Sequence, residues 1–222
     1  MPTVSVRAKP AKSRGAKAAK PAPARGTRSR LEVDERRAQL VTLGIDLFAA
    51  RAYDEVSIDE LARAAGVSKG LLYHYFPTKR DFYVAALDQS SRELLALPLT
   101  PDSAPPAERI ESGLLAYLDY VEHHGHAYVA LMRGGIGSDA EVQSILERTR
   151  ATFVERIKES IPKGLATPLV RITLRGWVGF VEATSIEWLS RRTVPRHKLV
   201  LLLASVLLHS LQHAGGPRLG GP

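Results

Sequence analysis

Apolar residues recur at helical spacing over most of the chain after Asp34. The first stripe follows the spacing i, i+3, i+7, i+8, which places side chains on one face of a helix. It consists of Leu40, Leu43, Leu47 and Phe48. No run alternates between apolar and polar residues as a half-buried strand would. The pattern therefore predicts an all-α protein.

Start signals divide this pattern into nine helices. Capping boxes, in which a side chain and a backbone amide bond reciprocally, are expected to begin at Ser57, Thr78 and Ser138. Prolines follow Thr167 and Val194, where the first turn of a helix tolerates them. The predicted helices span residues 34–52, 57–65, 68–75, 79–97, 106–125, 126–134, 139–161, 168–191 and 195–213.

Residues 98–106 contain four prolines, which interrupt the helical pattern. They mark the expected boundary between an N-terminal domain over residues 34–94 and a C-terminal domain over residues 95–214. Residues 215–222 are rich in glycine and proline, so we expect a flexible C-terminus.

Positive charge is concentrated at the start of the chain. Residues 1–30 hold nine basic residues and no acidic one, whereas the rest of the chain carries 22 basic and 23 acidic residues. Prolines at positions 2, 10, 21 and 23 oppose a helix there, so residues 1–33 are predicted to be a disordered basic tail. Such a tail could bind DNA phosphates without sequence preference, or it could be a solvated extension or follow an unused start codon.

Composition excludes several classes of protein. Cysteine is absent, which rules out disulfides and thiolate zinc sites and fits a reducing compartment. The longest apolar run, residues 199–208, has ten residues, whereas a membrane span needs about twenty. We therefore expect a buried helix there, no membrane partner and no secretory signal.

Residues 57–81 have the pattern of two short helices joined by a sharp turn. Ser57 and Ser68 stand where each helix would be capped, and Gly66 between them accepts a positive φ. Leu72 and Phe76 stand at i, i+4, so we expect them to pack back against the first helix.

The outward positions of the second helix carry residues that contact nucleic acid. Lys69 and Tyr73 form one row, and Gly70 and His74 form the next. Lys, Tyr and His contact phosphates, and glycine allows a close backbone approach although it costs about 1 kcal/mol of helix propensity. Leu71 could meet a thymine methyl group or could be partly buried. The alternative is a solvated, charged helix face.

The segment DELARAAGVSKGLLYHYFPTKRDFYVAAL resembles the N-terminal domain of the TetR family of bacterial repressors, over roughly residues 34–94. The resemblance implies a helix-turn-helix at 57–76, with residues 68–75 as the recognition helix. Together with the expected caps and Leu71, the residues carried over from the family give the predicted DNA-binding set. It consists of Ser57, Ser68, Lys69, Gly70, Leu71, Tyr73, His74, Tyr75, Thr78 and Lys79.

The same resemblance implies that the C-terminal domain binds a ligand and forms a dimer through its last two helices. The predicted helices 168–191 and 195–213 are more apolar than isolated surface helices should be. A dimer bundle explains this, and a deep monomer core is the alternative.

Aromatic residues of the C-terminal domain could line a cavity for a small-molecule effector, or they could be ordinary core residues. They are Tyr117, Tyr120, Tyr128, Phe153, Trp177 and Phe180. Histidines cluster at 123, 124 and 126 and at 209 and 213, but no carboxylate or cysteine stands at ligand spacing. We predict neither a metal nor a cofactor.

The sequence thus indicates a homodimeric, ligand-responsive repressor that binds double-stranded operator DNA of nearly palindromic sequence. We expect it in the bacterial cytoplasm, associated with the nucleoid when bound to DNA. An architectural protein that binds DNA through the basic tail is the alternative. An enzyme is not expected, because paired carboxylates, a nucleophile elbow and an HExxH motif are absent.

Overall fold

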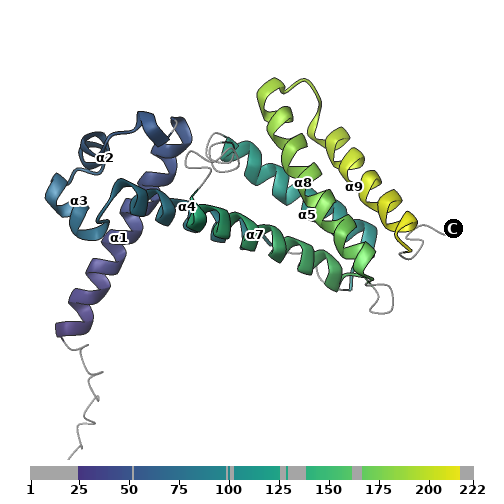
Figure 1. The fold of residues 1–222 in the computed structure, drawn as a ribbon, viewed down its shortest axis with the longest axis horizontal. Helices are drawn as coiled ribbons and strands as arrows, with labels where there is room; N and C mark the ends of the chain where they lie inside the picture. The colour runs from purple at the N-terminus through teal and green to yellow at the C-terminus, as the bar shows by residue number, and fades with distance from the viewer. Residues whose placement is uncertain are drawn as a thin grey trace, which may run out of the picture. The chain divides into compact units, whose positions relative to one another are not determined.

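The computed structural model describes residues 25–51, 53–98, 100, 103–125, 129, 139–161 and 167–215. The chain divides into two compact units, Met1–Arg36 and Arg37–Pro222. All regular structure in the described residues is helical, which confirms the all-α prediction (Figure 1). The helices are α1 (Arg25–Ala50), the 3-10 helix η1 (Tyr53–Glu55), α2 (Ile58–Ala64), α3 (Lys69–Tyr75), α4 (Lys79–Leu95), α5 (Pro106–His123), α7 (Ala140–Glu159), α8 (Pro168–Arg191) and α9 (Arg196–His213).

The start of α1 and the cap of α7 differ from the predictions, whereas the other helix bounds lie within two residues of those predicted. Helix α1 begins at Arg25, within the segment predicted to be disordered, because no proline follows Pro23 until Pro77 and the helical pattern can extend backward. Helix α7 begins at Ala140 with Asp139 as its N-cap, and the expected cap Ser138 lies outside the described residues. The predicted helix 126–134 also falls almost wholly outside them.

The other helix starts follow the sequence signals closely. The capping boxes at Ser57 and Thr78 are both formed. Thr167 caps α8 and is followed by proline, as expected. Pro195 is itself the N-cap of α9, one position before the first turn in which it was expected.

The first hydrophobic core joins α1, α2, α3 and α4. Leu61 of α2 and Leu72 of α3 have no exposed surface, and Phe76 is 2% exposed, as the predicted packing of the two short helices requires. The first turns of α7 complete this core with Val142 and Ile145. The proline-rich segment therefore does not separate two independent cores.

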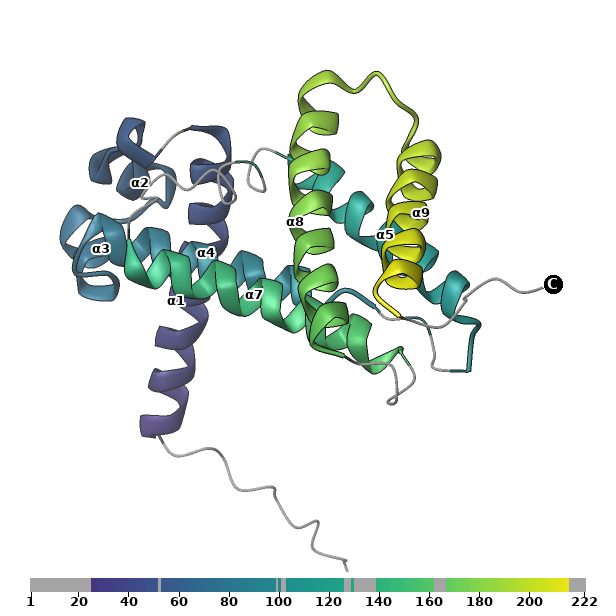
Figure 2. The same ribbon diagram turned by 45° about the vertical axis from the view of Figure 1, so that its right-hand side comes forward.

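The second core is built by α5, the last turns of α7, α8 and α9. Its fully buried centre includes Leu118, Leu174, Leu203 and Leu207. Helices α8 and α9 lie side by side in both views (Figure 2). Within the described part of the chain, no helix is long and apolar enough to cross a membrane.

Candidate nucleic-acid interface

The start of α2 is held by a network of three side chains. The Ser57 hydroxyl accepts a hydrogen bond from the Glu60 amide at 3.2 Å, and the Glu60 carboxylate accepts one from the Ser57 amide at 2.9 Å. Arg51 donates to the same carboxylate at 2.9 Å. These bonds, first that from Arg51, lower the pKa of Glu60 to about 2. The first short helix is thereby fixed to the residue that follows α1.

The turn between α2 and α3 requires a left-handed residue. Gly66 supplies it with a φ of +63°, and the Val67 amide donates back to the Ala62 carbonyl at 3.0 Å. Ser68 then caps α3, its hydroxyl accepting from the Leu71 amide at 3.1 Å. This geometry turns one side of α3 toward the core and leaves the other side free.

The free side of α3 carries the residues predicted to contact DNA. Lys69, Gly70 and His74 are exposed, and Tyr73 is 40% exposed. Leu71 is 39% exposed, so of its two expected placements the structure has the outward one.

Tyr75 is half-buried and packs against the first core. Its ring meets that of His74 edge-on, with centroids 5.6 Å apart. It therefore borders the exposed face and contacts His74 on that face.

Lys69 is already engaged in the free protein. Its Nζ lies 3.0 Å from the Asp59 carboxylate of α2, and both side chains are at least half exposed. The hydrogen bond to Asp59 raises the pKa of Lys69. A phosphate that approaches this ammonium group would compete with the Asp59 carboxylate for its N–H donors.

Gly70 stands in open space. A Cβ atom built on it meets no heavy atom within 4 Å. The fold of the free protein therefore does not require glycine at this position, and the missing side chain leaves room for close approach of another molecule.

The start of α4 presents the last two predicted residues. The Thr78 hydroxyl accepts from the Asp81 amide at 3.0 Å and caps the helix, whose first amides lack carbonyl partners within the helix. The Lys79 ammonium lies 4.2 Å from the centroid of the Tyr53 ring, which holds it beside the helix start.

Arg80, which sequence reasoning missed, ties this end of α4 to α7. Its guanidinium donates to Asp139 at 2.8 Å and to Glu141 at 3.0 Å. The hydrogen bond from Arg80 is the main cause that lowers the pKa of Asp139 to about 2. No local signal in the sequence pairs residues 59 positions apart. The sequence pattern also predicted Ser138 as the cap of α7, so it gave Asp139 no role.

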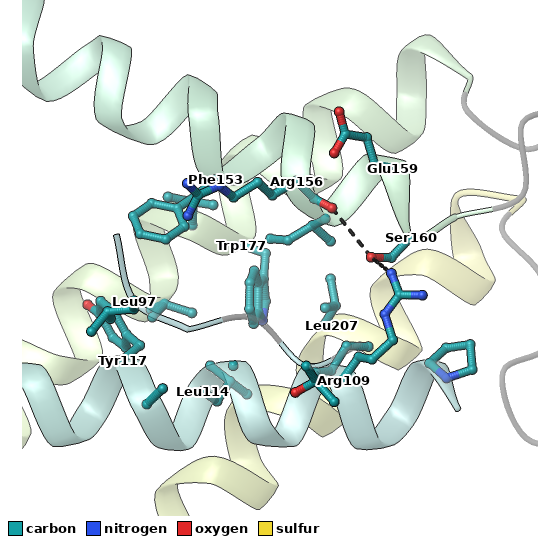
Figure 3. Close-up of a pocket in the computed structure, with 18 of the residues that line it drawn as sticks. Leu97, Arg109, Leu114, Tyr117, Phe153, Arg156, Glu159, Ser160, Trp177 and Leu207 are labelled. Atoms are coloured by element: carbon teal, nitrogen blue, oxygen red, sulfur yellow. Dashed lines mark hydrogen bonds between the residues drawn. The ribbon is translucent and has the colours of Figure 1, made fainter. Parts of the chain in front are cut away.

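A cavity of about 460 Å³ lies between α5, α7, α8 and α9 (Figure 3). Three of the predicted aromatic residues, Tyr117, Phe153 and Trp177, line it. The indole of Trp177 is fixed by a 2.9 Å hydrogen bond to the Leu203 carbonyl.

The other three predicted aromatic residues do not meet at this cavity. The Tyr120 hydroxyl donates to the Ser90 carbonyl at 3.2 Å, and burial raises the pKa of Tyr120 to about 12. Phe180 is 38% exposed on α8, and Tyr128 lies outside the described residues.

Polar residues that sequence reasoning missed also line the cavity. Arg109 of α5 hydrogen-bonds to the Ser160 hydroxyl, and Arg156 of α7 donates to the Leu95 carbonyl at 2.6 Å. An arginine on an amphipathic helix reads as part of a solvated face, so the sequence held no signal for either.

The histidines bond locally. His123, His209 and His213 each turn Nδ1 toward the carbonyl four residues earlier, at 2.8 or 2.9 Å. His124 stacks on Tyr120. His126 lies outside the described residues, and those that are described include no group of three side chains placed to hold a metal ion.

Two family models match the chain. The model for bacterial regulatory proteins of the tetR family matches residues 40–86, and that for the tetracyclin repressor-like C-terminal domain matches residues 106–209.

Known proteins give the same result. A tetR-family transcriptional regulator from Streptomyces coelicolor, solved by crystallography, is 33% identical, and the similarity covers 82% of each chain with a TM-score of 0.73. The transcriptional activator FasR of Mycolicibacterium smegmatis is 28% identical over 76% of this chain and 80% of its own. The transcriptional repressor KstR2 of Mycobacterium tuberculosis is 28% identical over 56% of this chain and 60% of its own. The chain therefore belongs to the TetR family, and it is a DNA-binding transcriptional regulator rather than an enzyme.

Proposed function

We propose that this regulator is a homodimer that represses transcription from a nearly palindromic operator and responds to a small molecule. The observation that carries the proposal is the exposed face of α3, which is built by a capped turn and occupied by residues that contact nucleic acid. The family matches fall on residues 40–86 and 106–209, so they lend no support to an architectural protein that binds through residues 1–33.

In this proposal α3 enters the major groove. Lys69, Tyr73 and His74 contact phosphates, Gly70 lets the backbone approach, and Leu71 meets a thymine methyl group. The remaining contacts come from the caps and from the start of α4, where the first amides of the helix favour a phosphate. The whole proposed set is Ser57, Ser68, Lys69, Gly70, Leu71, Tyr73, His74, Tyr75, Thr78 and Lys79.

The outward faces of α8 and α9 support the proposed dimer. Large apolar side chains are exposed there: Leu169 at 55%, Ile172 at 69%, Phe180 at 38%, Leu201 at 57% and Leu202 at 49%. Pairing these faces between two subunits removes apolar surface from water. It also supplies two recognition helices, which a palindromic operator needs at a spacing of about 34–36 Å or a multiple of it.

The effector would occupy the cavity between α5, α7, α8 and α9. To release DNA, the effector must bind more tightly to the state with low operator affinity. An effector with equal affinity for both states would not change their populations. Relatives include an activator and a repressor, and the proposed direction here is repression in the bacterial cytoplasm.

Selection of bound fragments from the source genome by the purified chain, followed by gel shift, tests the proposal. We expect an inverted repeat whose shift is lost in Lys69→Ala/Tyr73→Ala. Arg148→Gln, which removes an exposed charge from α7, is the matched control and should keep the shift. Binding without sequence preference, weakened equally for all DNA by salt, would contradict the proposal.

A further inference from the structure

The cavity lining combines an apolar body with two arginines, Arg109 and Arg156, and two glutamates, Glu159 and Glu182, and this combination restricts its ligand. The inference rests on the proposed ligand response. Most of the lining is aliphatic or aromatic and includes Leu94, Ile110, Leu114, Phe153, Trp177 and Leu207. Such a lining takes a ligand whose body is apolar, with specificity set by a few polar groups.

Arg156 is the polar group that stands out. It is half-buried on α7, and its guanidinium donates to the backbone carbonyl of Leu95 at 2.6 Å. Of the nearby acids, Glu155 pairs with Lys158 at 2.7 Å and Glu182 pairs with Arg150 at 3.0 Å, whereas Glu159 lines the cavity about one turn after Arg156. Among the residues that the structure describes, no carboxylate lies within ion-pair distance of Arg156.

A half-buried guanidinium of this kind favours an anion, because a charge-assisted fork to a carboxylate or phosphate is stronger than a bond to a neutral carbonyl. Figure 3 shows Arg156 extending beside Phe153, whereas Arg109 reaches toward Ser160 on the other side of Trp177. An anionic head at Arg156 therefore leaves the apolar centre of the cavity for the body of the ligand.

The carbonyl that Arg156 holds belongs to the last residue of α4. The final carbonyls of a helix lack intrahelical partners and carry its negative end, so Arg156 caps α4 from α7. The other end of α4 begins at Thr78 and Lys79, in the proposed DNA-contacting set. One guanidinium thus belongs both to the cavity and to the helix that carries the DNA-contacting end.

We infer that the effector is an amphipathic anion, with an aliphatic or aromatic body and a carboxylate or phosphate head. The head accepts hydrogen bonds from the Arg156 guanidinium and replaces the Leu95 carbonyl as its partner. Loss of this contact releases the C-terminal end of α4. Binding and release are coupled because the ligand and the helix end compete for the same donor.

Calorimetric titration of the full chain with decanoate, decyl phosphate and decanol tests the head group without any DNA. We expect both anions to bind at least about tenfold more tightly than decanol. The fluorescence of Trp177, measured in a Trp188→Phe background that leaves it as the single tryptophan, should change with each bound ligand. Equal affinity for decanoate and decanol, or no binding of either anion, would overturn the inference.

Two variants of Arg156 test whether this residue binds the anionic head group of the ligand. Arg156→Gln should lose the preference for decanoate while still binding decanol, and Arg156→Lys should keep part of that preference. Arg148→Gln is the matched control, since Arg148 bridges α7 to Asp88 of α4 at 2.6 Å but does not line this cavity. It should keep the full preference. An unchanged preference in Arg156→Gln, with its helix content confirmed by circular dichroism, would place the head elsewhere and refute the inference.

Operator binding separates this inference from the proposed function. Decanoate should weaken operator binding of the wild-type chain but have no effect on Arg156→Gln. If the wild-type chain binds decanoate through Arg156 yet binds no operator, the proposed function fails and the assignment of the head group stands. If decanoate binds through Arg156 and operator affinity does not change, the coupling through Leu95 is wrong.

Discussion

The guanidinium of Arg80 forms a two-pronged hydrogen bond with the carboxylate of Asp139, at 2.5 and 2.8 Å. Arg80 lies in the first turn of α4, beside Lys79, and Asp139 is the N-cap of α7. The pair therefore fixes the end of α4 that is proposed to contact DNA to the start of α7, which reaches the cavity. A forked arginine–carboxylate pair sets orientation as well as distance.

Asp139→Asn should lower the melting temperature of the protein. The change removes the charge that pairs with Arg80 but keeps a side chain able to cap α7. The expected decrease is about 2–4 °C, measured by thermal unfolding. In a double-mutant cycle with Arg80→Gln, the combined loss should be smaller than the sum of the single losses. Additive effects would show that the two residues act independently.

The contribution of Asp139 to stability should depend on pH. Its folded-state pKa of about 2 lies below the ordinary aspartate value of 3.8, so the carboxylate stabilises the fold fully above about pH 4. That contribution is lost as the pH falls through about 2. Denaturant unfolding of the wild type and of Asp139→Asn should therefore differ at pH 6 and converge toward about pH 2. A constant difference across this range would contradict the assignment.

Lys69 and Asp59 should have opposite effects on DNA binding. Lys69→Ala removes a phosphate contact, so operator affinity should fall by about tenfold and the salt slope should become less steep by about one counterion. Asp59→Asn removes the carboxylate that competes for Lys69 at 3.0 Å, so operator affinity should rise. Gel shifts over a series of salt concentrations measure both. A decrease in Asp59→Asn would mean that the carboxylate orients Lys69 for binding.

Gly70→Ala should separate folding from DNA binding. The new methyl group meets no atom within 4 Å, and alanine favours a helix, so stability should stay unchanged or rise by up to about 1 kcal/mol. Operator affinity should nevertheless fall by about tenfold, because the methyl group would stand between α3 and the DNA. Gly113→Ala in α5, which adds a methyl group in the open space of the cavity and not on α3, is the control and should bind operator normally without effector.

Ile172→Glu should prevent dimerisation without unfolding the subunit. Ile172 is 69% exposed on α8, so a charge there is tolerated in a monomer but not in an apolar interface. Analytical ultracentrifugation should show a monomer with wild-type helix content. Leu115→Glu, at a 43% exposed position of α5, should remain a dimer. A dimeric Ile172→Glu would exclude this face as the interface.

Local signals in the sequence predicted much of the DNA-binding half. Capping at Ser57 and Thr78 depends on residues three positions apart, and Gly66 marks its turn because few other residues accept its φ. The all-α fold and the family followed from these patterns. The sequence predicted these features because each interaction joins residues within one or two helical turns.

Long-range relationships could not be read in the same way. Nothing near Arg156 in the sequence indicates that it reaches the Leu95 carbonyl, 61 residues earlier. Tyr117 and Tyr120 stand one turn apart with similar surroundings, yet one lines the cavity and the other packs toward Ser90. Side-chain direction within a helix bundle depends on how neighbouring helices pack, which the periodicity of one helix does not specify.

Helix α7 contributes to both cores, and this limits how the molecule can be divided. Its first turns bury Val142 and Ile145 with the DNA-binding helices, while Val154 lies in the second core. A fragment cut at the proline-rich segment would leave the first core open on the side that α7 covers. Exchange of DNA-binding halves between relatives would therefore need to carry the first turns of α7 along with residues 34–94. The two halves are distinct in sequence, but their hydrophobic cores cannot be separated without dividing α7.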